Sequence, residues 1–354
     1  MTMSAKSYVR KVVSGEAGLW KSSKPVLARL DIELTERCNN DCLHCSVNLP
    51  AGDIEARASE WTAARWKALL DEAAGLGCLV VRLTGGEPLL RADFEEIYLH
   101  ARRLGLRVML FTNATLVTPR LARLLRAVPP LEAVEVSVYG LTEKSYEAVT
   151  RARGSFAACR RGLGLLGENG VAFTVKGAVL PPTRDEADAL EAWAVGLPGN
   201  TGSTSFATLF DLRSRPGDGK SALIAGLRMG GDEFVSFSRR RGEGAVDAWR
   251  DFCGRSGGAR GDRLFTCLPS GASAAVDPYG RLQYCLGLRH PDAVCDLASG
   301  SLREAMTGFL PRLRGRRASD PAYIERCGRC FLKGLCEQCP AKSWAEHGTL
   351  DTPV

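Results

Sequence analysis

Short apolar segments alternate with longer amphipathic stretches through roughly the first 210 residues. Each short segment is rich in β-branched residues and has the length of a strand. The pattern predicts six strands, at Arg29–Leu34, Leu79–Leu83, Arg107–Phe111, Ala133–Val138, Ala172–Leu180 and Thr204–Phe210. Because helical stretches separate these segments, we expect βαβ units and a parallel sheet.

Apolar residues recur at helical spacing between the strands. The clearest helical stretches are Ser59–Leu76, Asp93–Leu104 and Ser155–Glu168, with Ser59 as the expected N-cap of the first and Thr62 within its first turn. This alternation alone leaves open whether the sheet closes into a partial barrel or forms a doubly wound sheet.

The alternation fades after about residue 215, and 217–261 is rich in Gly, Arg and Asp, as linkers are. A cysteine-rich composition begins at Leu264, where Ala274–Val276 and Arg281–Tyr284 predict a hairpin. We therefore expect an N-terminal extension (1–27), an α/β domain (28–215), a bridging region (216–263) and a small cysteine-rich domain (264–354).

Composition narrows the class of protein. With 354 residues and 45% apolar content the chain can bury a large core, and no apolar run approaches the roughly 18 residues that span a bilayer. Met1–Lys24 lacks the apolar core of a signal peptide, so thirteen cysteines indicate a reducing cytoplasm more than a disulfide framework. The net charge of +7 includes an arginine cluster at 312–317, but no aromatic residues interleave it, so nucleic acid is not expected and an acidic peptide remains open as a partner.

Three closely spaced cysteines, Cys38, Cys42 and Cys45, follow the first strand in a C-x3-C-x2-C pattern. Cubane 4Fe-4S clusters are normally held by four thiolates, so three donors on one loop would leave one iron open to another ligand. A zinc knuckle uses similar spacings and is the alternative. Polar residues also end the next strands, in Gly85-Gly86-Glu87-Pro88, in Asn113 and in Ser137, and the carboxyl ends of parallel strands meet at one edge.

The cysteine triplet together with the Gly-Gly-Glu-Pro turn resembles the radical S-adenosylmethionine (SAM) superfamily. The resemblance implies a partial (β/α)6 TIM-like barrel and a 4Fe-4S cluster that reductively cleaves SAM to a 5′-deoxyadenosyl radical, which abstracts hydrogen from a substrate. It also implies roles in binding SAM: Gly85, Gly86 and Glu87 for the methionyl amine, Asn113 and Ser137 for the ribose or carboxylate, His44 for the adenine and Arg151 for the carboxylate.

Each of these roles has a structural alternative. Asn113 and Ser137 also suit ordinary turns, His44 a surface position, and Arg153 is as close in sequence as Arg151. Many relatives carry an acidic residue where this chain has Tyr139, so the contact made there is open.

The C-terminal cysteines resemble the SPASM extension of radical SAM enzymes, which binds auxiliary iron-sulfur clusters. By that resemblance Cys267, Cys285 and Cys339 share one cluster, and Cys327, Cys330 and Cys336 a second. The pattern's final cysteine would fall beyond Val354, so either the chain is truncated or one cluster has a non-cysteine ligand or an open site. Zinc sites are the alternative. Isolated cysteines, at 78, 159, 253 and 295, are expected to be small core residues.

A peptide or protein substrate is the expectation that follows from the SPASM resemblance, with a crosslink or an oxidised side chain as the product. An electron donor of the flavodoxin or ferredoxin type and a separate leader-peptide recognition protein are the expected partners. A radical dehydrogenase or epimerase acting on a sugar and a non-enzymatic zinc-binding protein remain the alternatives. No acid, base or hydrogen donor can be named from the sequence.

Overall fold

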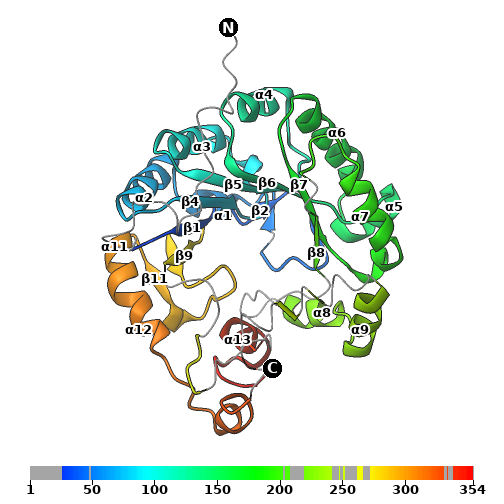
Figure 1. Ribbon diagram of the computed structural model, residues 1–354. Helices are drawn as coiled ribbons and strands as arrows, with labels where there is room; N and C mark the ends of the chain where they lie inside the picture. Colours follow the sequence, from blue (N-terminus) through cyan, green and yellow to red (C-terminus); the bar gives the residue numbers. More distant parts are fainter. Residues whose placement is uncertain are drawn as a thin grey trace.

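The chain folds around one curved sheet with helices on its outer face (Figure 1). The computed structural model describes residues 26–353 apart from 48, 202–203, 208–218, 241–246, 248–249, 252–260, 266–271, 331–332 and 334–337. The sheet has nine strands in the order β11-β10-β9-β1-β4-β5-β6-β7-β8. A two-stranded sheet, β2 (Arg37–Cys38) and β3 (Leu49–Pro50), lies in the loop after β1.

All six predicted strands are present and pair in parallel along the chain order. They are β1 (Arg29–Glu33), β4 (Val80–Thr84), β5 (Arg107–Thr112), β6 (Leu131–Ser137), β7 (Thr174–Ala178) and β8 (Ser205–Ala207). The main helices covering them are α2 (Ala63–Gly75), α3 (Phe94–Arg103), α4 (Pro119–Ala127), α5 (Glu143–Thr150), α6 (Ser155–Glu168) and α7 (Ala187–Val195).

The helices cover a single face of the sheet. Strand residues that point toward them are fully buried, as Leu30, Val81 and Val136 are, because they pack on the apolar stripes of the helices. Their neighbours on the inner face, including Phe111 and Lys176, keep part of their surface exposed. A doubly wound sheet would bury both faces, so the partial barrel is confirmed.

The predicted start of the first helical stretch, Ser59–Leu76, is wrong. Ser59 ends a separate short helix, α1 (Ile54–Ser59), and Thr62 is the N-cap of α2, its hydroxyl accepting from the Arg65 amide at 3.4 Å. Between them Glu60 is extended, and its buried carboxylate binds Arg37 at 2.9 Å and Arg91 at 3.2 Å. These long-range ion pairs interrupt the helix that local pattern predicts.

The predicted hairpin forms, but as a continuation of the barrel sheet. Strand β9 (Ser273–Val276) pairs in parallel with β1, β10 (Arg281–Gln283) returns antiparallel to β9, and β11 (Val294–Asp296) adds the edge. The turn residue Gly280 has φ +85°, and the ring of Trp61 occupies the place of a β-carbon. The sheet is therefore continuous across residue 264, and the domain division stays a prediction.

The remaining helices lie in the C-terminal half of the chain. They are α8 (Lys220–Gly226), α9 (Gly231–Arg240), α11 (Leu302–Glu304), α12 (Leu310–Arg314) and α13 (Pro340–His347). In Figure 1, α11 and α12 lie beside the β9–β11 edge of the sheet. No helix in the described ranges is long and apolar enough to cross a membrane.

Candidate functional site

The cysteine loop, residues 38–45, lies past the carboxyl end of β1 and is fastened to α5. The Asp41 amide donates to the Thr150 carbonyl at 2.8 Å, and the Leu43 amide donates to the Val149 carbonyl at 2.9 Å. Cys38, Cys42 and Cys45 are all half-buried. Backbone bonds to the end of a helix thus hold the three thiols at the mouth of the barrel.

The three thiols influence one another's ionisation, so they form one group. Burial raises the pKa of Cys38 to about 12, and the charges of Glu87 and Cys45 add to the rise. Burial, followed by the charges of Cys45 and Cys38, raises the pKa of Cys42 well above its usual range. Cys38 Sγ accepts from the Asn40 amide at 3.4 Å and from Asn113 Nδ2 at 3.8 Å.

The Gly-Gly-Glu-Pro turn packs directly on the segment that leads into the cysteine loop. The amides of Gly86 and Glu87 donate to the Thr35 and Arg37 carbonyls at 2.7 and 2.9 Å. A β-carbon on Gly86 would lie 2.6 Å from the Arg37 carbonyl carbon. Gly85 has φ +145°, and a β-carbon there would collide with the Thr35 carbonyl. Both glycines are therefore required by the chain's own backbone.

Glu87 has a structural side chain. Its carboxylate is fully buried and accepts from Thr112 Oγ1 at 2.8 Å, the Asn113 amide at 2.8 Å and the Leu89 amide at 3.1 Å. Burial raises its pKa to about 7 against these hydrogen bonds. Pro88 follows as the first residue of a short 3-10 turn. The carboxylate thus joins the turn to the end of β5, and a ligand would meet the turn's backbone.

Asn113 faces the cysteine loop from the end of β5. Its Nδ2 donates to Asn39 Oδ1 at 3.0 Å, and its Oδ1 accepts from the Thr115 amide at 2.9 Å. Asn39 in turn donates to Thr115 Oγ1 at 2.7 Å. Both ends of the Asn113 amide already make hydrogen bonds within this network. A role for Asn113 beside the ribose or carboxylate of SAM stays a prediction.

His44 and Tyr139 lie together over the cysteine loop. Their ring centroids are 4.8 Å apart in an edge-on arrangement. Burial lowers the pKa of His44 to about 4, so the imidazole is neutral. Burial raises the pKa of Tyr139 well above its usual range, as do the neighbouring Cys42 and Cys45, while a hydrogen bond with Ser137 opposes the rise. Ser137 therefore supports the tyrosine that covers the loop.

Arg151 braces the cysteine loop from the end of α5. Its guanidinium contacts Asp41 twice, through the carbonyl and the carboxylate, each at 2.6 Å. The residue has φ +51°, a left-handed conformation that caps α5. Its predicted contact with the SAM carboxylate would compete with Asp41.

Of the predicted auxiliary ligands, Cys267 and Cys336 lie outside the described residues, as does Cys253. Cys339 is the N-cap residue of α13. Gly287 lies between this helix and Cys285, because a β-carbon added at Gly287 would lie 3.6 Å from the Ala341 β-carbon and 3.8 Å from Cys285 Sγ. This places Cys285 close to the start of the helix that Cys339 begins.

The second predicted group is centred on a turn after residue 327. The Cys330 amide donates to the Cys327 carbonyl at 3.3 Å, and the buried Lys333 donates to the carbonyls of Gly261 and Arg263 at 2.5 and 3.0 Å.

Two of the cysteines expected to be core residues, Cys78 and Cys159, are buried, whereas Cys295 is half-buried in β11.

Sequence reasoning missed a buried ion network between the barrel and the C-terminal region. Arg289 donates to Glu33 at 2.5 Å and to Glu36 at 2.6 Å, and Tyr279 donates to Glu36 at 2.8 Å. The charges of both glutamates raise the pKa of Arg289, although burial opposes the rise. The sequence carried one signal, two glutamates close together at the end of an apolar strand, but nothing indicated the arginine.

The donor set fits an iron-sulfur cluster. Three half-buried thiols on one loop, one of them accepting two N–H groups, match the ligation and sulfur hydrogen bonding of such clusters. Among the described residues no three His, Cys, Asp or Glu side chains are gathered closely enough to hold a single metal ion.

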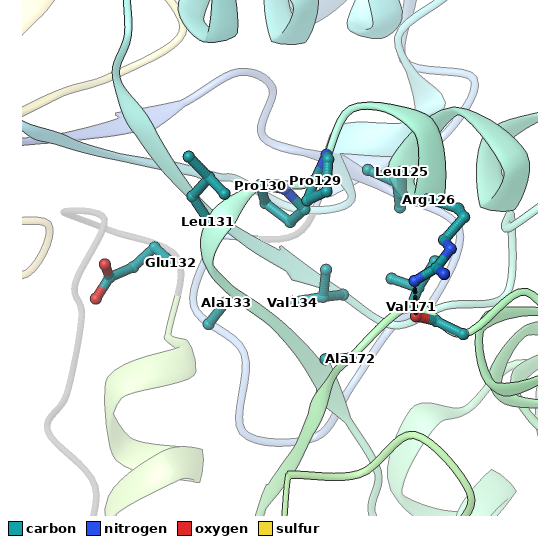
Figure 2. A pocket seen from close by; sticks show the side chains of 11 residues that line it. Leu125, Arg126, Pro129, Pro130, Leu131, Glu132, Ala133, Val134, Val171 and Ala172 are labelled. Carbon is teal, nitrogen blue, oxygen red and sulfur yellow. Dashed lines mark hydrogen bonds between the residues drawn. The ribbon is translucent and has the colours of Figure 1, made fainter. Parts of the chain in front are cut away.

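One described cavity lies at the opposite end of the strands. It measures about 300 Å³ and is lined by Pro129, Pro130 and Leu131 before and within β6, and by Val171 ahead of β7 (Figure 2). Arg126 closes one side, donating to the Gly170 carbonyl at 3.4 Å. Because it lies at the amino ends of the strands, this cavity is separate from the cysteine loop.

Comparisons with known proteins identify relatives of this chain. A family model described as the Radical SAM superfamily matches residues 32–193. The AdoMet-dependent heme synthase of Methanosarcina barkeri is 33% identical over 89% of this chain and 92% of that protein. The chain spans less than half the length of several other curated relatives; the PqqA peptide cyclase of Gluconobacter oxydans, for example, is 36% identical over 40% of this chain and 39% of that protein.

The solved structures agree on the fold. Streptococcus suis SuiB bound to S-adenosylmethionine superposes with a TM-score of 0.63 at 17% identity, over 91% of this chain and 75% of that one. On the fold, the cysteine loop and the match across the length of the heme synthase, the chain belongs to the radical SAM superfamily, with a SPASM-type cysteine region after its partial barrel.

Proposed function

We propose that this protein is a radical SAM enzyme that abstracts hydrogen from a peptide or protein substrate. The observation that carries the proposal is the locked assembly of the cysteine loop and the Gly-Gly-Glu-Pro turn at the carboxyl ends of the strands. Backbone bonds from Gly86 and Glu87 fix the turn to the loop, and Glu87 fixes it to β5. This is the edge at which parallel α/β folds bind ligands.

Cys38, Cys42 and Cys45 would hold a 4Fe-4S cluster, which supplies the electron that cleaves SAM to methionine and a 5′-deoxyadenosyl radical. The chain's own residues then have three tasks. The backbone of the Gly85–Gly86 turn would hold the methionyl amine. Asn113 and the Asn40 amide hydrogen-bond Cys38 and orient it. Tyr139 and His44 cover the loop with apolar ring surface and exclude water.

The peptide substrate is supported by relatives of two kinds. A PqqA peptide cyclase matches 40% of this chain, and SuiB, whose fold this chain shares, has been solved with its precursor peptide SuiA. A tetrapyrrole is the second candidate, because a heme synthase is the curated relative that matches over 92% of its length. An electron donor of the flavodoxin or ferredoxin type is the partner either reaction would require.

Anaerobic purification and reconstitution would test the proposal. Iron, sulfide and zinc are quantified in the wild type and in the Cys38/Cys42/Cys45→Ala variant, and each is then incubated with SAM and dithionite. We expect the wild type to form 5′-deoxyadenosine and the variant to form none while losing about four irons per chain. Zinc without sulfide in the reconstituted wild type would contradict the proposal and return the cysteines to a structural role.

Product analysis then separates the two substrates. Candidate precursor peptides and iron coproporphyrin III are each supplied to the active enzyme, and mass spectrometry follows hydrogen loss, crosslinking or loss of carbon dioxide. A change of mass in a peptide supports the first candidate, and a change in the tetrapyrrole supports the second.

A further inference from the structure

Charged side chains line the inner face of the barrel around a single aromatic ring. Phe111 on β5 has Arg82 on β4 to one side and Lys176 on β7 to the other, and Glu135 lies between them on β6. All four are only partly buried, although their strand neighbours on the outer face are fully buried. This inner face is therefore open to a ligand.

Both cations contact the same ring. The Arg82 guanidinium carbon is 4.7 Å from the Phe111 ring centroid, and Lys176 Nζ is 2.7 Å from it. Cation–π contacts at exposed sites are weak, too weak to hold two like charges together without an anion. In the structure Glu135 supplies one, 3.0 Å from Lys176.

Among the described residues of this part of the inner face, the cations outnumber the carboxylates that they contact. Asp31 is shared by two arginines, Arg29 at 3.1 Å and Arg82 at 3.0 Å, and Glu135 pairs with Lys176. Three cations thus face two carboxylates in what we call the inner-face cluster, Arg29, Arg82, Lys176, Asp31 and Glu135. The buried Glu33–Glu36–Arg289 network lies at the carboxyl end of β1, where Tyr279 donates to Glu36.

The cluster lies just beneath the cysteine loop. Lys176 is in register with Ser137, the last residue of β6. Tyr139, which contacts His44 of the loop, follows Ser137 by two residues, an advance of about 7 Å along an extended chain. A group held by Lys176 would therefore lie within about one substrate residue of the site where SAM is expected.

We infer that the inner-face cluster binds a carboxylate of the substrate, with Lys176 and Arg82 as its partners and Phe111 packing against the adjoining carbon chain. Glu135 is the counter-ion in the empty site, and the substrate carboxylate displaces it from Lys176. Charge-assisted hydrogen bonds of this type are stronger than neutral ones and set orientation. This inference rests on the proposed function and narrows its substrate class to carboxylates, whether of a peptide side chain or of a tetrapyrrole.

Binding to the full-length, reconstituted protein with SAM and without reductant would test the inference. Two matched pairs of probes are used: a blocked pentapeptide with a central glutamate against the same peptide with glutamine, and coproporphyrin III against its tetraamide. We expect the acid member of at least one pair to bind about tenfold more tightly than its neutral partner. Which pair shows the preference identifies the source of the carboxylate.

Three variants test whether the preference for the acid probe over the neutral probe arises at the inner-face cluster. Lys176→Met should abolish the difference between the acid and neutral probes by weakening the acid alone. Glu135→Gln should tighten binding of the acid several-fold, because it removes the competing carboxylate; this opposite sign keeps the test decisive if Lys176→Met folds poorly. Lys67→Met is the matched control, since it removes a lysine ion-paired at 2.5 Å with Glu96 on the outer helices.

The inference is overturned if neither pair shows a preference for the acid, if the preference survives Lys176→Met, or if Glu135→Gln weakens the acid probe. Because binding is measured without reductant, these outcomes are independent of SAM cleavage. A wild type that makes no 5′-deoxyadenosine would instead count against the proposed function.

Discussion

Replacing Gly86 by alanine tests whether the turn is held by the chain's own backbone. The added β-carbon would lie 2.6 Å from the Arg37 carbonyl carbon and 2.7 Å from the Glu36 carbonyl oxygen. Both are backbone atoms of the segment entering the cysteine loop, so neither can move away as a flexible side chain would. The substitution therefore must separate the turn from the loop.

The cost follows from two terms. Overpacking of this kind costs about 1–3 kcal/mol. Separating the turn also breaks the bonds from the Gly86 and Glu87 amides to the Thr35 and Arg37 carbonyls, at about 1 kcal/mol each. The sum, about 3–5 kcal/mol, is a large part of the stability of a typical domain.

Thermal unfolding and iron content are the measurements. We expect Gly86→Ala to lower the Tm by about 4–7 °C and to lose cluster iron after reconstitution, because Cys38 follows the displaced Arg37 directly. Gly52→Ala is the control, since a β-carbon there meets nothing within 4 Å. If Gly86→Ala matched Gly52→Ala in both Tm and iron content, the backbone account of the turn would be wrong.

Three further predictions concern charges. Arg289→Met should cost about 3–5 kcal/mol in urea unfolding, because it removes the cation that both buried glutamates contact, and unchanged stability would contradict this. The pKa of Glu87 is about 7 in the fold against an ordinary 4.5, so the protonated carboxyl stabilises the fold fully below pH 4.5. We expect up to about 3 kcal/mol of this stabilisation to be lost as the pH rises to 7. Glu87→Gln should flatten the dependence of the unfolding free energy on pH between 4.5 and 7. Arg151→Ala removes a solvent-screened pair with Asp41, so unfolding should change by less than about 1 kcal/mol, whereas cluster absorbance in air should decay faster than in the wild type.

The strands were predictable because each apolar run must be buried on at least one face. All six predicted strands formed, and the Ser155–Glu168 helix has the predicted bounds. The first helix failed at its start because Glu60 is drawn to Arg37 and Arg91, residues far away in sequence. Local pattern carries no information about such pairs.

The candidate site was predictable in its members more than in their roles. Two local patterns indicate the site in the sequence: the spacing of Cys38, Cys42 and Cys45, and the paired glycines of the turn. Closely spaced thiols are typical of cluster or metal ligands, and adjacent glycines are typical of places where backbone atoms approach closely. The partners of Glu87, Asn113 and Arg151 could not be foreseen, since each is a side chain or backbone group brought close only by the fold.

The sequence by itself determined the alternation of strands and helices, the thiol triplet and the glycine turn, since these depend on local periodicity and on residue type. Tertiary structure alone decided that one face of the sheet stays open, that β9 joins β1, and that Arg82 and Lys176 meet at Phe111. The physical reason is that charges far apart in sequence acquire their energies only when strand order and register set the distances between them.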